Sequence, residues 1–161
     1  MKGQAAIALG SNLDSEFGDR EANLREAVRR VGELGEVRAV SSFYDTEPVG
    51  YREQPRFLNA ALVLETELGP LELMRKLLSV ERAMGRIRGG RERVGAVAKG
   101  PRVIDLDLLL YGDWAQWSEE LILPHPAMAE RRFVLEPLAE IAPDWVHPVL
   151  AKTVRELLVF S

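Results

Sequence analysis

The sequence predicts an α+β fold in which helices pack on an antiparallel sheet. Strand-like and helix-like segments follow one another in the order strand, helix, strand, strand, helix, strand, and smaller elements come after them. This order is the split βαβ pattern of the ferredoxin-like sandwich. The 161 residues contain no internal repeat, low-complexity tract or linker, so we expect a single domain over residues 1–161.

The first elements are predicted from their hydrophobic spacing. Residues 4–10 form a mostly apolar run that ends at a Gly-Ser-Asn turn signal, which predicts a buried strand. Apolar side chains recur at helical spacing over about 19–34, and Gly35 suits the position after the last helical turn. Residues 37–44 are strand-like but weakly patterned, and the Pro and Gly content of 46–55 predicts a loop.

The second strand-helix pair is patterned more clearly. The strand over 57–66 alternates cleanly and carries Phe57 and Asn59 on one face. A second helix begins at Pro70, which suits the first helical position, and ends at Gly85.

The last strand of the pattern covers residues 102–111. Alternation along it places Asp105 and Asp107 on one face, together with Val103 and Leu109. The opposite face is apolar and consists of Ile104, Leu106, Leu108 and Leu110. The smaller elements expected beyond it are an edge strand over 114–117, a rigid turn over 123–126, a helix over 130–139, a loop over 143–148 and a helix over 153–160.

The composition excludes several classes of function. There is no cysteine, which excludes disulfides, zinc-thiolate sites and a thiol nucleophile. No apolar run reaches the roughly 18 residues of a membrane span, and the N-terminus leads into the first strand rather than into a signal peptide. The net charge of -4 counts against general nucleic-acid binding. We therefore expect a cytoplasmic protein that binds neither nucleic acid nor membranes.

Two carboxylates stand out on the last strand. Asp105 and Asp107 lie on one face, roughly 6.6 Å apart along the strand. Asp is a poor strand former and aligned acids repel each other, so a strand this apolar is unusual without a compensating cation. Carboxylate oxygens at this spacing suit Mg²⁺ that also holds phosphates. The alternative is a solvated sheet face that carries two harmless acids.

A basic, glycine-rich segment precedes this strand. It contains a single acid, Glu92, and six basic residues: Arg86, Arg88, Arg91, Arg93, Lys99 and Arg102. Arg side chains match phosphate oxygens in a bidentate fashion, so the segment and the paired acids together predict a site for a polyphosphate and Mg²⁺. The alternative is a solvated loop that happens to be basic.

Phe57 and Asn59 share one face of the cleanly alternating strand. An aromatic side chain on a sheet is usually core, but an Asn amide needs hydrogen-bond partners. A flat heterocycle would satisfy both residues, because it can stack on Phe57 and hydrogen-bond to Asn59. Phe133 could supply the other side of such a sandwich, although its pattern alone favours core packing.

One histidine is placed for chemistry. His125 lies between two prolines, which fix the backbone and aim the imidazole. Such a side chain could donate to a phosphate or act as an acid or base. The second histidine of the chain, His147, we interpret as structural.

These stretches together resemble the 6-hydroxymethyl-7,8-dihydropterin pyrophosphokinases (HPPK) of folate biosynthesis. The resemblance runs from about residue 6 to residue 148 and rests on many separate motifs in the right order. They are IALGSNL (7–13), SSFY (41–44), TEPVG (46–50), QPRFLNA (54–60), GR (85–86), GPRVIDLD (100–107), PHP (124–126) and RRF (131–133). The resemblance implies a ferredoxin-like catalytic domain that transfers a pyrophosphoryl group from ATP to the pterin hydroxymethyl group, leaving AMP.

The resemblance also implies roles for individual residues. Asp105 and Asp107 would hold two Mg²⁺ ions, and Arg86 and Arg102 would act with them in catalysis. The pterin-binding residues would be Thr46, Pro48, Val49, Phe57, Asn59 and Phe133. The ATP-binding residues would be Arg86, Arg88, Lys99, Arg102, Leu108, Leu121, Ile122, His125 and Arg131. We expect the segment 89–99, which is longer than is usual in the family, to close over the triphosphate, and we expect a monomer.

Two other functions account for fewer of these residues. Another Mg²⁺-dependent nucleotide phosphotransferase on a ferredoxin-like fold would keep the carboxylates but would not need Phe57, Asn59 and Phe133. A ferredoxin-like RNA-binding module would need exposed aromatic side chains in basic surroundings. The paired acids and the net negative charge count against that module.

Overall fold

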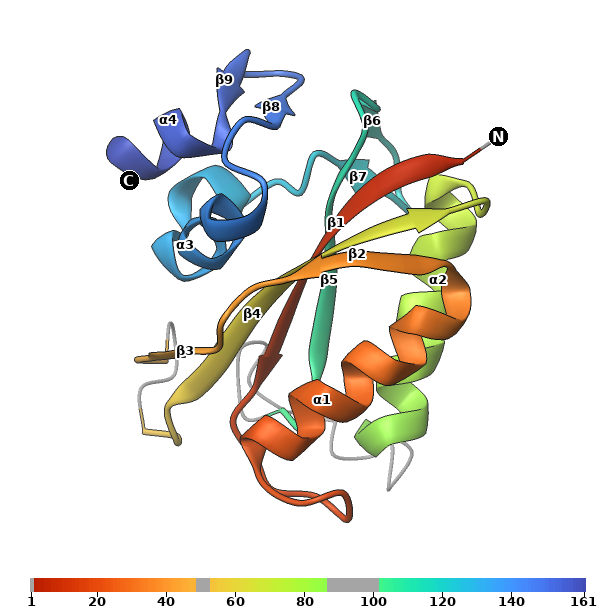
Figure 1. Cartoon of the computed structure of the whole chain (residues 1–161), viewed down its shortest axis with the longest axis vertical. Coiled ribbons are helices and arrows are strands. Elements are labelled where there is room, and N and C mark those ends of the chain that lie inside the picture. Colours follow the sequence, from red (N-terminus) through yellow and green to blue (C-terminus); the bar gives the residue numbers. More distant parts are fainter. Residues whose placement is uncertain (1, 49–52, 87–101) are drawn as a thin grey trace.

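A five-stranded sheet lies at the centre of the computed structural model, which describes residues 2–48, 53–86 and 102–161 (Figure 1). Its strands are β1 (Gly3–Ser11), β2 (Glu36–Val40), β3 (Tyr44–Thr46), β4 (Phe57–Thr66) and β5 (Asp105–Tyr111). Their spatial order is β2-β4-β1-β5, β3 also pairs with β4, and these pairings are all antiparallel. This arrangement confirms the predicted ferredoxin-like α+β fold.

Helices cover both faces of this sheet (Figure 1). The helices α1 (Arg20–Val31) and α2 (Pro70–Glu81) lie on one face, and α3 (Arg132–Ile141) lies on the other with α4 (Val154–Val159) beside it. The short elements are η1 (Gly32–Leu34), η2 (Arg82–Arg86), η4 (Met128–Glu130), β6 (Gln116–Trp117), β7 (Ile122–Leu123), β8 (Val146–His147) and β9 (Lys152–Thr153). None of the helices in the described part of the chain has the length and apolar character needed to cross a bilayer.

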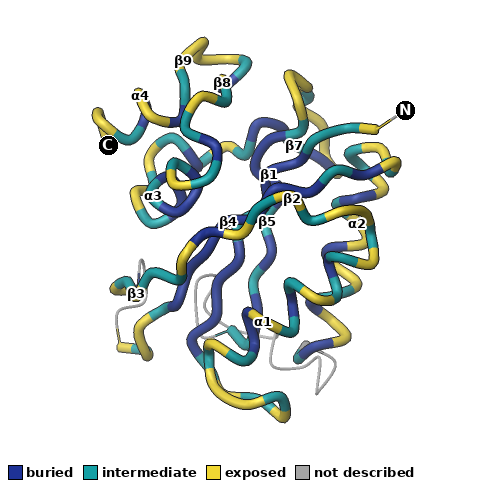
Figure 2. Tube along the Cα trace, viewed as in Figure 1, coloured by how far each residue is buried: buried dark blue, intermediate teal, exposed yellow. Residues whose placement is uncertain are grey.

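Buried apolar side chains form two clusters, one on each face of the sheet. The first packs α1 and α2 against the sheet and includes Leu62 and Leu64 of β4. The second packs α3 and α4 against the other face and includes Ala61 and Val63. The alternation predicted for 57–66 is therefore confirmed, and because both faces are covered, β4 is buried over most of its length (Figure 2).

The alternation predicted for the last strand is wrong at its C-terminal end. Opposite β1, Ile7 pairs with Leu108 but Ala6 pairs with Leu110, so Leu109 is an extra residue in β5. Such a β-bulge interrupts the alternation of side chains. Leu109 and Leu110 both pack into the α3 cluster, whereas Leu110 was expected on the opposite face from Leu109.

The segment predicted as one weak strand over 37–44 is divided into β2 and β3. Ser41 lies between them, and its hydroxyl accepts the backbone N–H of Ala61 at 2.9 Å. A side-chain oxygen thus satisfies a donor that a strand carbonyl would otherwise satisfy. The division leaves β3 as a separate short strand that pairs with the first residues of β4.

Two glycines lie where a side chain would collide. Gly35 follows the last helical residue, Leu34, as predicted, whereas Gly85 does not end its helix. Gly35 follows η1 with an extended backbone (φ 168°), and a Cβ there would lie 2.3 Å from the carbonyl oxygen of Glu65. The helix α2 continues into the π-helical turn η2, which includes Gly85. A Cβ at Gly85 would lie 2.8 Å from the Cβ of Val103. Close packing explains why both positions are glycine, and Gly35 is in addition the residue that ends η1.

The C-terminal elements follow the prediction with shifted bounds. The last helix begins at Val154 because Thr153 and Glu156 form a reciprocal capping box. The expected helix over 130–139 begins at Arg132, and Glu130 belongs to η4. The predicted loop over 143–148 contains β8, which pairs with β9.

Replacing Gly35 by Ala should lower the free energy of unfolding by about 2 kcal/mol, because the carbonyl of Glu65 is backbone and cannot rotate away. Gly32→Ala is the matched control. Gly32 has helical dihedrals (φ -62°), and its added Cβ would meet no atom closer than 3.7 Å. That substitution should raise stability by about 0.5 kcal/mol. Urea unfolding of both variants measures the difference, and equal effects would contradict the packing argument.

Candidate active site

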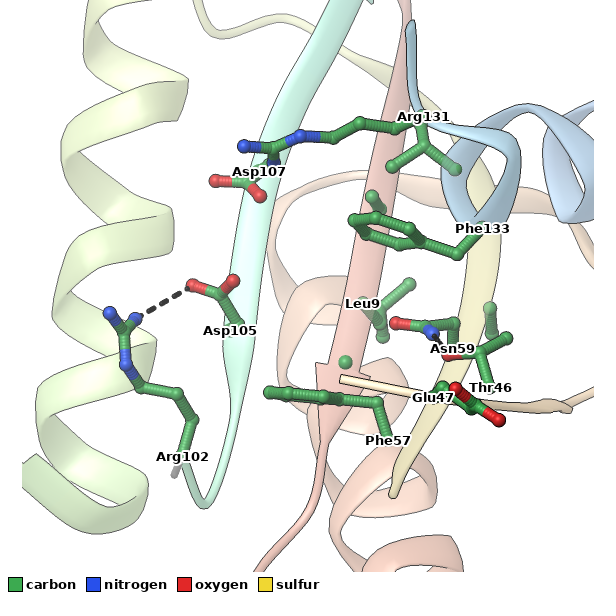
Figure 3. Close-up of a pocket in the computed structure, with 14 residues that line it drawn as sticks. Leu9, Thr46, Glu47, Phe57, Asn59, Arg102, Asp105, Asp107, Arg131 and Phe133 are labelled. Atoms are coloured by element: carbon green, nitrogen blue, oxygen red, sulfur yellow. Dashed lines mark hydrogen bonds and ion pairs between the residues drawn. The ribbon is translucent and has the colours of Figure 1, made fainter. Parts of the chain in front are cut away.

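A cavity of about 710 Å³, open to solvent, lies between the sheet and α3 (Figure 3). Eight residues that were predicted for the site line it: Thr46, Phe57, Asn59, Arg102, Asp105, Asp107, Arg131 and Phe133. They come from β3, β4, β5, the residues just before β5 and the start of α3, so parts of the chain that are far apart in sequence face one space. The wall also contains Leu9, Gly10 and Glu47, which the sequence analysis did not single out.

Asp105 and Asp107 enter this cavity from β5 (Figure 3). The guanidinium of Arg102 lies 3.2 Å from Oδ1 of Asp105, and the side chain of Arg131 lies beside Asp107. Burial, followed by the charge of Asp105, raises the pKa of Asp107 to about 7, although Arg131 and Arg102 act in the opposite direction. The ionised form of Asp107 is therefore unfavourable here unless more positive charge is present.

The rings of Phe57 and Phe133 face the cavity from opposite sides (Figure 3). Asn59 lies at the side of the space between them, and its Nδ2 donates to Oγ1 of Thr46 at 2.5 Å. A Cβ at Gly10 would lie 2.9 Å from Oδ1 of Asn59, so the close approach of β1 depends on a glycine there. The result is a slot with two aromatic walls and a polar edge, which suits a flat heterocycle.

A second cavity, of about 680 Å³, lies between β5 and α2. Four of the predicted ATP-binding residues line it: Leu108, Leu121, Ile122 and His125. Asp107 lines this cavity as well as the first, so the two cavities share this residue.

The imidazole of His125 has a defined hydrogen bond. Its Nδ1 accepts the backbone N–H of Ala127 at 3.2 Å. Burial, followed by the charge of Arg131, lowers the pKa of His125, although Asp105 acts in the opposite direction. A neutral imidazole that accepts at Nδ1 carries its proton on Nε2, which is then a donor for an anionic ligand.

A buried carboxylate that the sequence analysis missed supports the strand that carries the aspartates. Glu81 is 4% exposed, and its Oε2 accepts the backbone N–H of Leu106, the residue between Asp105 and Asp107, at 2.6 Å. The signal was present in the sequence, because Leu73, Leu77 and Glu81 recur every four residues on the buried face of α2. An acid at the end of an apolar helical stripe needs a buried donor.

Some predicted site residues lie outside the part of the chain that the structure describes. Val49, Arg88 and Lys99 lie outside it, and so does the predicted lid over 89–99. Arg86 is the last residue of η2, just before this gap, and Pro48 is a buried residue just before the gap at 49–52. Their roles stay predictions.

Comparison with known proteins agrees with this geometry. The family model of 7,8-dihydro-6-hydroxymethylpterin-pyrophosphokinase (HPPK) matches residues 6–143. The chain belongs to this family. A Methylorubrum extorquens protein named 2-amino-4-hydroxy-6-hydroxymethyldihydropteridine pyrophosphokinase is 46% identical over 158 residues, 96% of this chain and 91% of the relative. A Bacillus subtilis protein of the same name is 46% identical over 143 residues, 88% of this chain and 79% of the relative.

Longer proteins contain a similar unit. The Schizosaccharomyces pombe folic acid synthesis protein fol1 is 39% identical over 156 residues, which are 96% of this chain but 20% of that protein. The crystal structure of wild-type Plasmodium falciparum HPPK-DHPS superposes with a TM-score of 0.72 over 99% of this chain and 45% of that one. At 15% identity this likeness concerns the fold alone.

Membership of the family confirms the reaction that the resemblance implied. HPPK enzymes transfer a pyrophosphoryl group from ATP to the hydroxymethyl group of 6-hydroxymethyl-7,8-dihydropterin, in folate biosynthesis. The family therefore decides against the two alternatives considered from the sequence, a different nucleotide phosphotransferase and an RNA-binding module.

The raised pKa of Asp107 predicts how stability depends on pH. Between about pH 4 and pH 7 the folded state holds a proton that the unfolded state releases, so the free energy of unfolding falls as pH rises through this window. Asp107→Asn removes the effect. In metal-free buffer the variant should be more stable than the original protein at pH 8, by on the order of 2–4 kcal/mol.

Denaturant unfolding at several pH values tests this prediction. The difference between Asp107→Asn and the original protein should shrink toward zero near pH 4. Asp113→Asn, in the exposed turn after the same strand, is the control and should show no such trend. A difference that does not change between pH 5 and pH 8 would contradict the assignment.

Proposed function

We propose that the two adjoining cavities hold the two substrates of the HPPK reaction and that transfer occurs beside Asp105 and Asp107. The observation that carries this proposal is that Asp107 lines both the aromatic slot and the cavity beside α2. A pterin in the slot and a nucleotide in the second cavity would then approach each other at the carboxylates. Proximity of this kind is a large part of catalysis in a two-substrate transfer.

The slot matches the shape and polarity of the pterin. The bicyclic ring would lie between Phe57 and Phe133, and Asn59 would hydrogen-bond its edge with the help of Thr46. Pro48 and Val49 would complete that edge. The hydroxymethyl group would then extend toward β5.

The second cavity suits ATP. Leu108, Leu121 and Ile122 offer an apolar wall for adenine. The phosphates would lie toward Arg102, Arg131 and Nε2 of His125, and Arg86, Arg88 and Lys99 would add positive charge from the preceding segment. Arg side chains stabilise the charge that develops on a phosphoryl group during transfer.

The carboxylates fit Mg²⁺, and we propose that Asp105 and Asp107 hold two such ions. Their hard oxygen donors, and the cost of ionising Asp107 without a cation, both support this assignment. No group of three or more potential ligands gathers in the described chain, so the remaining ligands would be water and phosphate oxygens. When bound, Mg²⁺ neutralises phosphate charge and lowers the pKa of the substrate hydroxyl.

The proposed transfer is a direct displacement at the β-phosphorus of ATP. The pterin hydroxyl oxygen forms a bond to the β-phosphorus of ATP, the bond between that phosphorus and the oxygen bridging to the α-phosphate breaks, and AMP leaves. The proton of the hydroxyl group is released to solvent water. The chain orients both substrates in line, and Arg102 and Arg131 stabilise the charge of the departing and transferred groups. We also expect one catalytic domain that acts as a monomer in the cytoplasm; these points stay predictions.

The reaction is tested by mixing the protein with ATP, Mg²⁺ and 6-hydroxymethyl-7,8-dihydropterin and separating the nucleotides. We expect AMP and the pterin diphosphate in equal amounts. ADP as the product would contradict the proposal, because it would indicate transfer of a single phosphoryl group.

Asp105→Ala and Asp107→Ala should each lower the rate of AMP formation by at least about 100-fold, because the charge stabilisation supplied with Mg²⁺ is worth several kcal/mol. Both variants should fold, since removal of either acid relieves repulsion. Asp113→Ala, an exposed acid after the same strand, is the matched control and should keep full activity. Near-full activity in either site variant would exclude the metal assignment.

Phe133→Ala should weaken pterin binding about tenfold, because one stacking wall of the slot is lost. Binding of an unreactive ATP analogue should change little, since Phe133 does not line the second cavity. Phe160→Ala removes an exposed phenylalanine, 76% accessible, and should affect neither ligand. Titration calorimetry with each ligand measures both effects, and an equal loss of both ligands would indicate a structural role for Phe133.

A further inference from the structure

The two walls of the aromatic slot belong to different layers of the fold. Phe133 lies in the first turn of α3, whereas Phe57 and Asn59 lie on β4 and Thr46 ends β3. The separation of the walls therefore depends on how α3 is held against β3 and β4. Buried apolar residues such as Leu135 and Leu138 pack α3 on the sheet, but apolar contacts are not directional.

A polar cluster joins the same helix to the start of β3. Glu140 of α3 accepts the backbone N–H of Ser42 at 3.0 and 3.1 Å, the Ser42 hydroxyl at 3.0 Å and the Tyr44 hydroxyl at 2.7 Å. We call Ser42, Tyr44 and Glu140 the Glu140 cluster. One carboxylate thus serves three donors, one of which is backbone and cannot rotate away.

The electrostatics of the cluster agree with its geometry. The hydroxyls of Tyr44 and Ser42 and the Ser42 N–H lower the pKa of Glu140, so the carboxylate is ionised at neutral pH. The same contact, helped by burial, raises the pKa of Tyr44 to about 12, so Tyr44 remains a donor. Hydrogen bonds to an ionised acceptor are stronger and shorter than those between neutral groups.

The cluster lies on the face of the sheet that holds the slot. In the β3-β4 register Tyr44 is opposite Asn59 and Thr46 is opposite Phe57. Residues two apart on a strand share a face, and so do directly paired residues. On α3, Glu140 follows Phe133 by seven residues, which is about two turns and the same side of the helix.

We propose that Glu140 is a positioning residue that holds α3 against β3 and so sets the distance between Phe133 and the opposite wall of the slot. The inference rests on the proposed placement of the pterin. Glu140 does not line the cavity, so it acts through Phe133 on one side and through Thr46 and Asn59 on the other. The three-residue strand β3 pairs with β4 alone among the described strands. Ion pairs of Asp45 with Arg20 and Arg56 also hold β3, but the Glu140 cluster is the polar contact that ties it to α3.

Glu140→Ala tests the proposal. Since the buried residues of α3 remain, the variant should fold, but the slot should lose its fixed width and bind 6-hydroxymethyl-7,8-dihydropterin about tenfold more weakly. Affinity for an unreactive ATP analogue with Mg²⁺ should stay within about twofold, because Glu140 touches nothing that lines the second cavity. In steady-state kinetics the pterin KM should rise more than kcat falls.

Three further variants separate positioning from general stability. Tyr44→Phe should weaken pterin binding in the same direction but less, and Glu140→Gln, which keeps one acceptor oxygen, should restore part of the affinity that Glu140→Ala loses. Glu136→Ala is the matched control: Glu136 lies one turn earlier on α3 and forms its ion pair, at 3.8 Å, with Arg132 of the same helix. Its charge acts weakly on Tyr44, but the hydroxyl of Tyr44 donates to Glu140. Glu136→Ala should leave pterin binding unchanged.

The inference would be overturned if Glu140→Ala left the pterin affinity unchanged, or if it lowered the affinities for the pterin and the ATP analogue equally. A lower Tm without a change in pterin affinity would show that the cluster only stabilises the fold. The outcome is distinguishable from failure of the proposed function. If the unaltered protein forms no AMP, or if Phe133→Ala binds the pterin normally, the substrate placement fails. If those experiments succeed and Glu140→Ala behaves as the unaltered protein, the positioning role alone fails.

Discussion

Two carboxylates two residues apart on one strand repel each other, and burial makes the charge on the second of them unfavourable. Asp105 and Asp107 occupy β5, which ends the order of the central sheet among the described strands. The surrounding structure compensates with Arg102 and Arg131 and fixes the strand between the two acids through Glu81. This local electrostatic cost is the constraint on which the site depends, because burial and the charge of Asp105 oppose ionisation of Asp107 while Arg131 and Arg102 favour it.

The two faces of the sheet are covered to different extents. The face under α1 and α2 is filled by aliphatic side chains and supplies most of the hydrophobic core. The other face is only partly covered by α3, so a cavity remains beside it (Figures 1 and 3). The slot therefore lies where the side chains of α3 no longer cover the sheet. Polar contacts such as the Glu140 cluster then fix the separation of its two walls.

Much of the site was predictable from local pattern. Strict alternation on β4 placed Phe57 and Asn59 on one face, and alternation near the start of β5 did the same for the two aspartates. The prediction was wrong at Leu110, because a β-bulge depends on the pairing with β1 and leaves no mark in the alternation of one strand. Gly85 was interpreted as a helix end, whereas it lies inside η2 and its close contact with Val103 explains the glycine.

The sequence by itself determined the order of the main elements, the two faces of β4 and of the first half of β5, and the family to which the chain belongs. These features depend on which residue types recur at short spacing. The backbone periodicity of a strand or helix then determines the side to which each side chain points. The tertiary structure decided that Asp107 lines both cavities, that Glu81 supports the strand between the aspartates, and that Glu140 reaches Ser42 and Tyr44. Such contacts join residues up to 98 positions apart, and their geometry is set by the packing of one layer on another.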